Sequence, residues 1–415
     1  MIKRIKARNF LSLKDVDVEL GPRNVFVGPN MSGKSNLIEC IKFLQDATKR
    51  YSASNDSTPL QEALSKRGGF SELVWKGHPC GPISFALMVE LGQTENKPTS
   101  YRYELSLRRH EYGHTEVESE KLTANSDGQE QIVLDNSGGK MKIVDAETIT
   151  EHAQNNIGLG LEVLGRYGSS ARGYGPSVGG RFCDFLARCR FYHLVPALMR
   201  QSNPPAWEEY LSEHGDNLSA WLLTLQNHTE EFRRIKQVCC DVLPGLGELL
   251  FQPVAPPRAP LKMGDQTFSI TTESGKISVG ASEIHFSKPI SLARMSDGEL
   301  AFLGLISIIL EPEDMSPPLL CIEEPENYLH PRLIEVFVEL LNQRAAEARA
   351  PQILATTHSL VLIDKFTLED LVVVDKVDGA TRFTRPSAKK HLHELLSRKE
   401  MSLGDLWYSG ALSDS

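Results

Sequence analysis

The sequence predicts an α/β fold that contains a parallel sheet. Two short runs rich in Ile, Leu and Val, at 319–322 and 352–356, lie on either side of a helix-like segment at 331–346. Apolar strands that alternate with helices are typical of a parallel sheet with helical crossovers. A third apolar run, at 24–27, passes through a glycine-containing loop into residues 37–44, whose apolar side chains share one helical face.

The remaining elements follow from local patterns. Alternating apolar and polar residues predict a hairpin over 2–20 and strands at 83–91, 101–109, 267–271 and 276–286. Helical spacing predicts a largely helical stretch over 180–250 and a helix over 296–310. Polar or Gly- and Pro-rich composition predicts a loop at 51–70, loops with short strands at 123–180, and a linker or edge at 251–260.

Composition excludes several classes of protein. The chain has 415 residues, with 45 Lys and Arg against 54 Asp and Glu, so its net charge of −9 excludes an overall basic coat for nucleic acid. The longest apolar run, 301–310, is too short to span a membrane, and no signal peptide is evident, so we expect a cytoplasmic protein without a membrane partner. The seven cysteines predict reduced thiols, and Cys183, Cys189 and His193 lack the CxxC spacing that would favour a zinc site.

A phosphate-binding loop is the clearest motif. Residues Gly28–Ser35, GPNMSGKS, fit the pattern G-x-x-x-x-G-K-[S/T]. Its glycines let backbone N–H groups curl around nucleotide phosphates, Lys34 reaches the β- and γ-phosphates, and the Ser35 hydroxyl ligates Mg²⁺. The nucleotide-binding residues predicted here are Gly28, Pro29, Asn30, Met31, Ser32, Gly33, Lys34, Ser35 and Asn36.

Two buried strands end in polar groups. Glu323 and Glu324 follow the apolar run 319–322, at the strand end where open α/β sheets bind ligands. Glu323 is placed to hold Mg²⁺ through water and Glu324 to orient or deprotonate an attacking water, although two acids before Pro325 also suit a helix cap. His358 ends the next strand, where it can bind a γ-phosphate, although a lone histidine is more often structural.

The segment Ser296-Asp297-Gly298-Glu299 opens the apolar helix predicted over 296–310. Ser at the N-cap with Glu three residues later is a capping box, which needs no ligand. The same helix start offers N–H groups, a hydroxyl and a glycine to an anion. Both interpretations remain open on this motif alone.

Together these motifs, in this order and spacing, resemble the SMC-like branch of the ABC-type ATPases, and more narrowly the predicted ATPases called AAA_21, OLD-like or RecF-like. The resemblance also rests on GGFSELVWKG at 68–77, HGDNLSAWL at 214–222, IEEPENYLHP at 322–331, ATTHS at 355–359 and SLGDLWYSG at 402–410.

The resemblance implies a role for each motif. Gly28–Ser35 becomes the Walker A loop, Glu323 the Walker B acid that serves Mg²⁺, and Glu324 the catalytic glutamate. Ser296–Glu299 becomes the signature motif, which in this family reaches the ATP of the opposite subunit. Residues 326–330 take the D-loop region and His358 the H-loop.

The resemblance also implies a split P-loop NTPase, an ABC-type ATPase head. Residues 1–125 and 286–375 would form one core, 126–285 an inserted and partly helical region, and 376–415 a tail packed on the core. There are departures from the family. Walker B carries Glu in place of Asp, the Q-loop glutamine falls near Ser71, no long coiled-coil arm interrupts the chain, and the segment after Phe366 is too short for a TOPRIM nuclease domain.

The function that the resemblance implies is Mg²⁺-dependent ATP binding and hydrolysis by a homodimer, or a higher oligomer, with ATP at the interface. Such an ATPase would be the motor or sensor subunit for a separate effector, such as a TOPRIM or other nuclease in bacterial anti-phage defence. We expect no nuclease in this chain, because no metal-ligand cluster is evident apart from the ATP site, and the basic runs at 108–110, 233–234 and 389–390 suit solvated faces.

Three alternatives stay open. One is a RecF- or SMC-like ATPase in DNA repair or maintenance, which would contact DNA. Another is a scaffold that uses ATP to dimerise, with little turnover. A third is a metabolic P-loop kinase, against which the SDGE and TTHS motifs argue.

Overall fold

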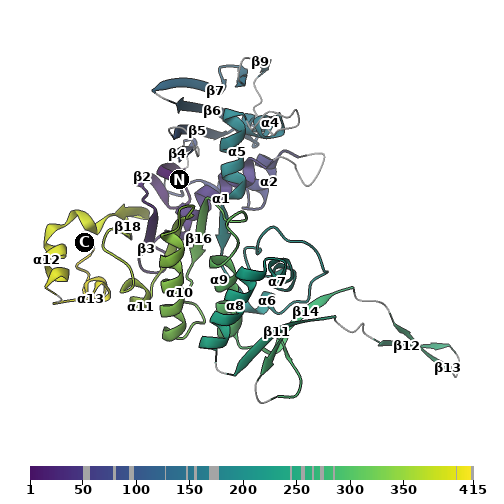
Figure 1. Ribbon diagram of the computed structural model, residues 1–415. Coiled ribbons are helices and arrows are strands. Elements are labelled where there is room, and N and C mark those ends of the chain that lie inside the picture. The colour runs from purple at the N-terminus through teal and green to yellow at the C-terminus, as the bar shows by residue number, and fades with distance from the viewer. Residues whose placement is uncertain are drawn as a thin grey trace. The chain divides into compact units, whose positions relative to one another are not determined.

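Figure 1 shows the protein as a computed structural model. The structure describes residues 1–49, 57–77, 81–92, 98–126, 128–145, 148–153, 157–167, 177–243, 245–253, 258–263, 266–271, 275–283, 286–398 and 400–412. The chain forms two compact units. The first contains Met1–Phe191, Pro317–Cys321 and Pro351–Ser415, and the second contains Tyr192–Ser316 and Ile322–Ala350. The four segments that the sequence predicts, divided after 125, 285 and 375, are a separate partition and stay a prediction.

An eight-stranded antiparallel sheet belongs to the first unit (Figure 1). Its order is β2-β1-β4-β5-β6-β7-β8-β9. The bounds are β1 (Ile2–Phe10), β2 (Leu13–Glu19), β4 (Ile83–Leu91), β5 (Thr99–Arg109), β6 (Thr115–Ser126), β7 (Gln129–Ser137), β8 (Lys140–Asp145) and β9 (Thr148–Ala153). The predicted hairpin over 2–20 and the predicted strands at 83–91 and 101–109 are confirmed. Burial alternates along β4 and β5, as expected for strands with one face on a core.

The stretch 123–180 is more ordered than the predicted loops with short strands. It contains the end of β6, all of β7, β8 and β9, and then helices α4 (Gly160–Tyr167) and α5, which begins at Val178. The short strands predicted in this stretch correspond to β7–β9. The bounds of β7 were not predictable because it has four exposed residues in succession, so period-two alternation does not appear in its sequence. Residues 168–176 lie outside the described part of the chain.

A six-stranded sheet has the order β10-β16-β17-β3-β18-β19. Its strands are β10 (Arg190–Tyr192), β16 (Leu319–Glu323), β17 (Gln352–Thr357), β3 (Arg23–Val27), β18 (Leu371–Val377) and β19 (Ala380–Thr384). β3 pairs in parallel with β17 on one side and with β18 on the other. The predicted parallel sheet is therefore confirmed. The chain passes from the first unit to the second within β16.

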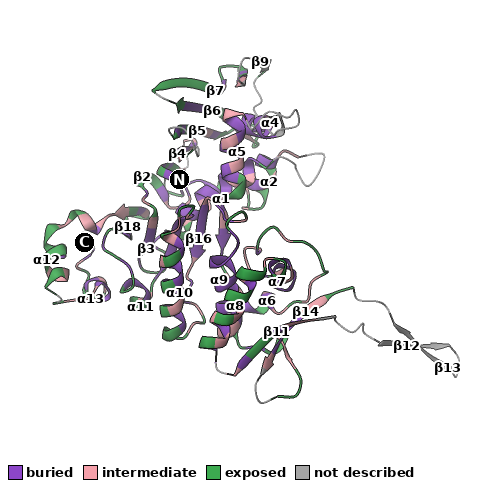
Figure 2. Cartoon of the chain, in the orientation of Figure 1, coloured by how far each residue is buried: buried purple, intermediate pink, exposed green. Residues whose placement is uncertain are grey.

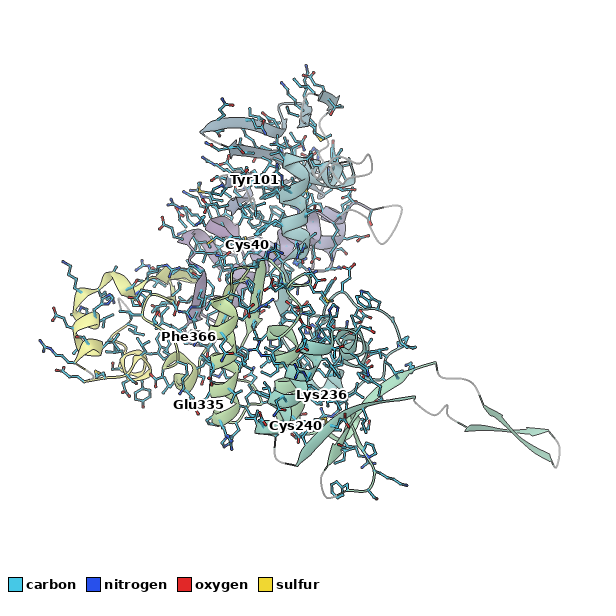
Figure 3. All side chains as sticks on the ribbon, viewed as in Figure 1. Cys40, Tyr101, Lys236, Cys240, Glu335 and Phe366 are labelled. Carbon is cyan, nitrogen blue, oxygen red and sulfur yellow. The ribbon has the colours of Figure 1, made fainter. Side chains whose placement is uncertain are left out.

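The first unit also contains eight helices within its described residues. They are α1 (Lys34–Ala47), α2 (Pro59–Ser65), α3 (Phe70–Leu73), α4, α5 (Val178–Arg188), α11 (Leu360–Ile363), α12 (Lys390–Ser397) and α13 (Leu403–Tyr408), with a 3₁₀ turn η2 (Pro386–Ala388). One apolar cluster joins α1 to both sheets, and Figure 3 labels two of its buried residues, Cys40 on α1 and Tyr101 on β5. The Gln45 amide donates to the carbonyls of Leu186 (2.7 Å) and Cys189 (2.8 Å), which fixes α1 to the end of α5.

The loop predicted over 51–70 is in part a helix. Residues 51–56 lie outside the described residues, but α2 occupies Pro59–Ser65. Thr58 and Gln61 form a capping box at its start, and Pro59 takes the first helical position. These residues are signals of a helix start, but the polar composition of the segment led to the prediction of a loop.

The second unit contains helices α6 (Pro196–Met199), α7 (Leu218–Gln226), α8 (Thr229–Val242), α9 (Asp297–Ile309) and α10 (Pro331–Ala345), and a 3₁₀ turn η1 (Leu292–Arg294). It also contains the sheet β11 (Leu246–Pro253), β14 (Ile277–Glu283) and β15 (Ile290–Ser291), and the hairpin β12 (Arg258–Met263) and β13 (Gln266–Thr271). Leu300–Ile309 of α9 is buried throughout (Figure 2), and Trp221 donates to the Ser307 hydroxyl at 3.2 Å. Of the linker predicted over 251–260, residues 254–257 lie outside the described residues.

The structure also bears on membrane-spanning helices and on the state of the cysteines. Among the described residues, no helix is both long enough and apolar enough to cross a membrane. The six cysteines within the described residues are free thiols. Burial raises the pKa of both the Cys189 thiol and the Cys239 thiol to about 12, so these side chains stay protonated.

Candidate functional site

The predicted phosphate loop connects β3 to α1. β3 is buried from Asn24 to Val27 and lies between two parallel strands, so the residues that follow it leave the sheet at a fixed position. α1 begins at Lys34, and its N-cap is Gly33, with φ of 102°. Gly33 has no side chain with which to cap the helix. An anionic ligand can take the place of a cap at such a helix start.

The two glycines of the motif are required by close contacts. A Cβ at Gly28 would lie 2.3 Å from the Val374 carbonyl oxygen and 2.8 Å from Ser32 Oγ. A Cβ at Gly33 would lie 2.0 Å from Thr381 Oγ1, in a left-handed backbone conformation that side chains disfavour. The loop is therefore held against β18 and β19 with no space for larger residues.

Lys34 folds back over the loop. Its side chain is buried, and Nζ donates to the carbonyl oxygens of Gly28 (2.8 Å) and Pro29 (3.1 Å). Ser32 Oγ is also buried and has no hydrogen-bond partner within the described residues. A buried ammonium and an unsatisfied hydroxyl in one curled loop are suited to a ligand rich in acceptor oxygens. The other loop residues, Pro29, Asn30, Met31 and Ser35, are exposed, and Asn36 is half-buried.

A chain of side-chain hydrogen bonds supports the loop from behind. Asn36 Nδ2 donates to Ser12 Oγ (2.6 Å), the Ser12 and Thr381 hydroxyl oxygens lie 2.5 Å apart, and Thr381 Oγ1 donates to the Ser32 carbonyl (2.8 Å). The Thr381 N–H also donates to the Ser12 carbonyl at 2.9 Å. We call Ser12, Asn36 and Thr381 the loop brace. Ser12 and Thr381 were not predicted as part of the site, since no motif marks them and they lie outside the loop motif at residues 28–36.

His358 follows the carboxyl end of β17, beside the carboxyl end of β3, where the phosphate loop begins. Thr357, the last residue of β17, pairs with Val27, the last residue of β3. His358 and Gly28 are therefore the next residues of two neighbouring parallel strands. His358 is exposed, while the Thr357 hydroxyl accepts the Ser359 N–H at 3.0 Å and fixes the turn after the strand. The structure thus brings together the predicted loop and the predicted histidine.

The glutamate pair lies in the second unit, where β16 ends at Glu323. Glu323 and Glu324 are half-buried, and Glu324 has a φ of 45°, which a non-glycine residue rarely adopts. Asn327 Nδ2 donates to Glu324 Oε2 at 2.9 Å, and the Asn327 N–H donates to the Glu324 carbonyl at 3.0 Å. A tight turn therefore orients the Glu324 carboxylate, and the first residues of α10 begin only at Pro331.

The Ser296–Glu299 segment forms the capping box of α9 in the second unit. The Ser296 N–H donates to Glu299 Oε2 (2.7 Å), and the Glu299 N–H donates to Ser296 Oγ (3.3 Å). Asp297 forms an ion pair with Arg200 at 2.7 Å. A Cβ at Gly298 would lie 2.8 Å from the Tyr328 carbonyl oxygen, so this glycine lets the segment approach the turn that carries Glu324. The capping interpretation is confirmed, and the anion-binding role of this segment stays a prediction.

Two other predictions concern single positions. Ser71, where the Q-loop glutamine was expected, lies on α3, and its hydroxyl accepts from Arg109 Nη1 at 3.2 Å. Cys183 and Cys189 are buried, with their thiols directed to the carbonyls of Leu161 (3.5 Å) and Phe185 (3.3 Å). These contacts agree with the expectation that the two cysteines are structural thiols.

Two family models match parts of this chain. Residues 1–154, which include the phosphate loop, match the family described as "AAA ATPase domain". Residues 208–364, which include the capping-box segment, the glutamate pair and His358, match the AAA_21 family, described as "AAA domain, putative AbiEii toxin, Type IV TA system". Among solved structures, an Smc head bound to the C-terminal winged-helix domain of ScpA has a TM-score of 0.53 at 14% identity, covering 94% of this chain and 99% of that one. Two ATPase family models therefore match separate parts of this chain, and its fold is similar to that of an SMC-type ATPase head.

Further matches are more distant or cover short segments. The Smc head of Pyrococcus furiosus bound to the C-terminal domain of ScpA has a TM-score of 0.53 at 12% identity, covering 96% of this chain and 99% of that one. These two likenesses show the fold, an SMC-type ATPase head. The OLD nuclease of Thermus scotoductus is 44% identical over 41 residues, and RecF of Lactococcus lactis subsp. cremoris is 31% identical over 87 residues. The segment matched to the OLD nuclease spans 10% of this chain and 8% of that protein. The segment matched to RecF spans 21% of this chain and 24% of that protein.

Proposed function

We propose that this SMC-like ATPase binds ATP at the Gly28–Asn36 loop and hydrolyses it. The observation that carries the proposal is the cradle formed by Gly28, Gly33 and Lys34 at the start of α1, with His358 one strand away at the same edge. The Lys34 ammonium and the positive end of α1 would bind the phosphates. His358 would orient the γ-phosphate, and Glu324 would accept the proton of the attacking water.

Mg²⁺ fits the donor set of this chain. Ser35 offers a hydroxyl and Glu323 a carboxylate, which are the hard oxygen ligands that Mg²⁺ prefers. When bound, Mg²⁺ would neutralise charge on the phosphates. The protein's own part is to hold the phosphates with Lys34 and to position water with Glu324, which the turn contact with Asn327 supports.

Binding and turnover are tested separately. Equilibrium binding of a fluorescent ATP analogue and release of inorganic phosphate, both with Mg²⁺, should show affinity and slow turnover in the wild type. Lys390→Ala is the matched control, since Lys390 is an exposed lysine on α12. Binding without phosphate release under every condition would leave the alternative of an ATP-dependent dimerising scaffold.

We further propose that two copies pair head to tail, with each Ser296–Glu299 segment facing the ATP of the other copy. Arg200 and the Gly298 contact preorganise this segment, which supports its use as a recognition element. The dimer, acting in the cytoplasm, would control a separate effector. We place this effector role in anti-phage defence, and the short match to an OLD nuclease is the support for a nuclease as the effector. The match to RecF, a DNA replication and repair protein, favours the alternative of DNA maintenance with DNA contact.

The effector hypothesis has its own experiment. The purified chain is incubated with DNA and RNA in the presence of ATP and either Mg²⁺ or Mn²⁺. We expect no cleavage by the chain alone and ATP-dependent activity when a neighbour-encoded effector is added. ATP-dependent cleavage by the chain alone, lost in Glu324→Gln, would overturn the assignment of nuclease activity to a partner.

A further inference from the structure

The turn between β5 and β6 gathers two histidines away from the phosphate loop. The His110 N–H donates to the His114 carbonyl at 2.8 Å, and the Gly113 N–H donates to the His110 carbonyl at 2.9 Å. Gly113 has a φ of 92°, which lets the chain reverse within these few residues. The turn stacks the two imidazole rings, whose centroids are 4.6 Å apart at an interplanar angle of 21°.

A buried glutamate lies beneath this pair. Glu116 is 8% exposed, and its Oε1 lies 3.6 Å from His110 Nε2 and 3.4 Å from His114 Nε2. Its other oxygen, Oε2, accepts from Nε and Nη2 of Arg108, both at 3.3 Å. Arg108 is the direct cross-strand neighbour of Glu116, so the carboxylate is held between the guanidinium and the imidazoles.

We propose that His110, His114 and Glu116 bind a divalent transition metal of the Zn²⁺ type. Their three ligand atoms all lie within 4.8 Å of one another. Zinc takes His nitrogen and Glu oxygen at about 2.0–2.2 Å in tetrahedral sites, which places neighbouring ligand atoms about 3.3 Å apart. The two imidazole–carboxylate distances are already close to that value, and His114 is 51% exposed, so its ring can turn inward.

The chemistry of each ligand fits this role. Arg108 occupies Oε2 and leaves Oε1 directed at the imidazoles, as outer-shell partners of metal-binding carboxylates commonly do. Tyr112 donates its N–H to His110 Nδ1 at 3.3 Å, a long contact. If His110 binds the metal through Nε2, its neutral ring must carry the proton on Nδ1. The hydrogen bond from the Tyr112 N–H to Nδ1 would then be lost. Three protein ligands leave a fourth position to water, so the site would fasten the hairpin turn to β6 and stay open on one side.

Without metal, the same residues would be an ion-pair cluster around Glu116. Arg108 already supplies one positive charge to this carboxylate. The Nε2 atoms of His110 and His114 instead converge with Oε1 of Glu116, as the three protein ligands of a metal ion do. The proposal differs from the sequence-based expectation that no metal-ligand cluster lies apart from the ATP site. Arg108 and Arg109 are exposed, as expected for a solvated face.

The test measures metal binding directly, without nucleotide and without a polyhistidine tag. Protein stripped with EDTA and desalted is titrated with Zn²⁺ by calorimetry, and with Co²⁺ by visible absorption. We expect one Zn²⁺ per chain at this site and a tetrahedral Co²⁺ spectrum without the near-ultraviolet thiolate band. His114→Ala should weaken Zn²⁺ binding by more than the ~10–100-fold that outer-shell changes cause.

Matched variants make the result specific. His391→Ala removes an exposed histidine from α12 and should bind Zn²⁺ as the wild type does. Glu116→Gln retains the size of the side chain and should weaken binding as His114→Ala does. The proposal is overturned if both His110→Ala and His114→Ala bind Zn²⁺ like the wild type, or if a thiolate Co²⁺ band shows that cysteines hold the metal. Absence of Zn²⁺ binding by the wild type would equally overturn it and leave the ion-pair cluster.

Discussion

Ser12 and Thr381 are 369 positions apart in the chain, yet their hydroxyl oxygens lie 2.5 Å apart directly behind the phosphate loop. Thr381 Oγ1 in turn donates a hydrogen bond to the Ser32 carbonyl, and Asn36 Nδ2, in the first turn of α1, donates to Ser12 Oγ. The loop conformation is thus set by a directed chain of hydrogen bonds, from the Asn36 amide through two hydroxyls to a backbone carbonyl. The loop sequence alone does not determine it.

Thr381→Val should loosen the loop. Valine keeps the shape of the side chain, but it leaves the buried Ser32 carbonyl without this donor, which typically costs about 1–3 kcal/mol of unfolding free energy. Chemical denaturation should show that loss, and ATP affinity should fall with it. Thr384→Val, on the same strand β19 and half-buried, is the control. Unchanged stability and affinity in Thr381→Val would remove the loop brace from this role.

Gly33→Ala should abolish ATP binding. An alanine Cβ would lie 2.0 Å from Thr381 Oγ1 and 2.6 Å from Ser12 Oγ, so the loop brace and the loop cannot both keep their places. Gly379→Ala separates this clash from the cost of the backbone conformation, because Gly379 also has a positive φ, of 77°, but nothing lies within 4 Å of its Cβ. The control should lose about 1 kcal/mol of stability and retain ATP binding. Equal behaviour of the two variants in a binding titration would contradict the steric argument.

Lys34→Ala should weaken ATP binding by tenfold or more. Hydrogen bonds to charged groups contribute about 1.5–3 kcal/mol, and Lys34 carries the buried ammonium of the cradle. Binding of a fluorescent ATP analogue measures the loss directly. Lys390→Ala should bind like the wild type. If both lysine variants bind ATP equally well, the cradle is not the nucleotide site.

Glu324→Gln should trap the ATP-bound state. A glutamine cannot accept the proton of the attacking water, so phosphate release should fall by about 10²–10⁴-fold while ATP affinity stays close to wild type. Glu339→Gln, on helix α10 of the same unit, is a suitable control. Single-turnover phosphate release distinguishes chemistry from product release. Normal turnover by Glu324→Gln would remove Glu324 from its assigned role.

Subunit mixing tests the head-to-tail dimer. Ser296→Arg disables the capping-box segment and Lys34→Ala disables the phosphate loop, so neither variant alone should hydrolyse ATP. A heterodimer of the two retains one unaltered pair of Lys34 and Ser296 from opposite copies, and mixing should restore part of the activity. Activity that is independent of protein concentration, with a monomer observed by light scattering, would contradict the composite site.

Contiguous motifs made part of the site predictable. The spacing of Gly28, Gly33 and Lys34 and the strand that ends at Thr357 are local patterns, and the register of β3 with β17 then places His358 beside the loop. The capping box at Ser296 was likewise visible in the sequence. These features depend on residues within a few positions of one another, which periodicity and motif spacing can detect.

Features built by tertiary contact were not predictable. Ser12 and Thr381 are ordinary residue types brought together by tertiary contact, since β19 packs beside β2 and the Thr381 N–H donates to the Ser12 carbonyl. The His110, His114 and Glu116 cluster depends on a hairpin turn, whose spacing resembles no familiar metal motif. Short strands were predicted in the stretch that contains β7–β9, but their bounds were not, since four successive exposed residues in β7 erase the alternation that marks a strand.

The position of β3 between β17 and β18 also governs when the site can form during synthesis. The ribosome makes β3 and the phosphate loop early, but both neighbours of β3, and Thr381 of the loop brace, come more than 300 residues later. At about 5–20 residues per second, the apolar strand Arg23–Val27 waits roughly 20–70 s for its partners. A nascent chain of this protein therefore carries an unpaired hydrophobic strand for most of its translation, and we expect ribosome-associated chaperones to bind it.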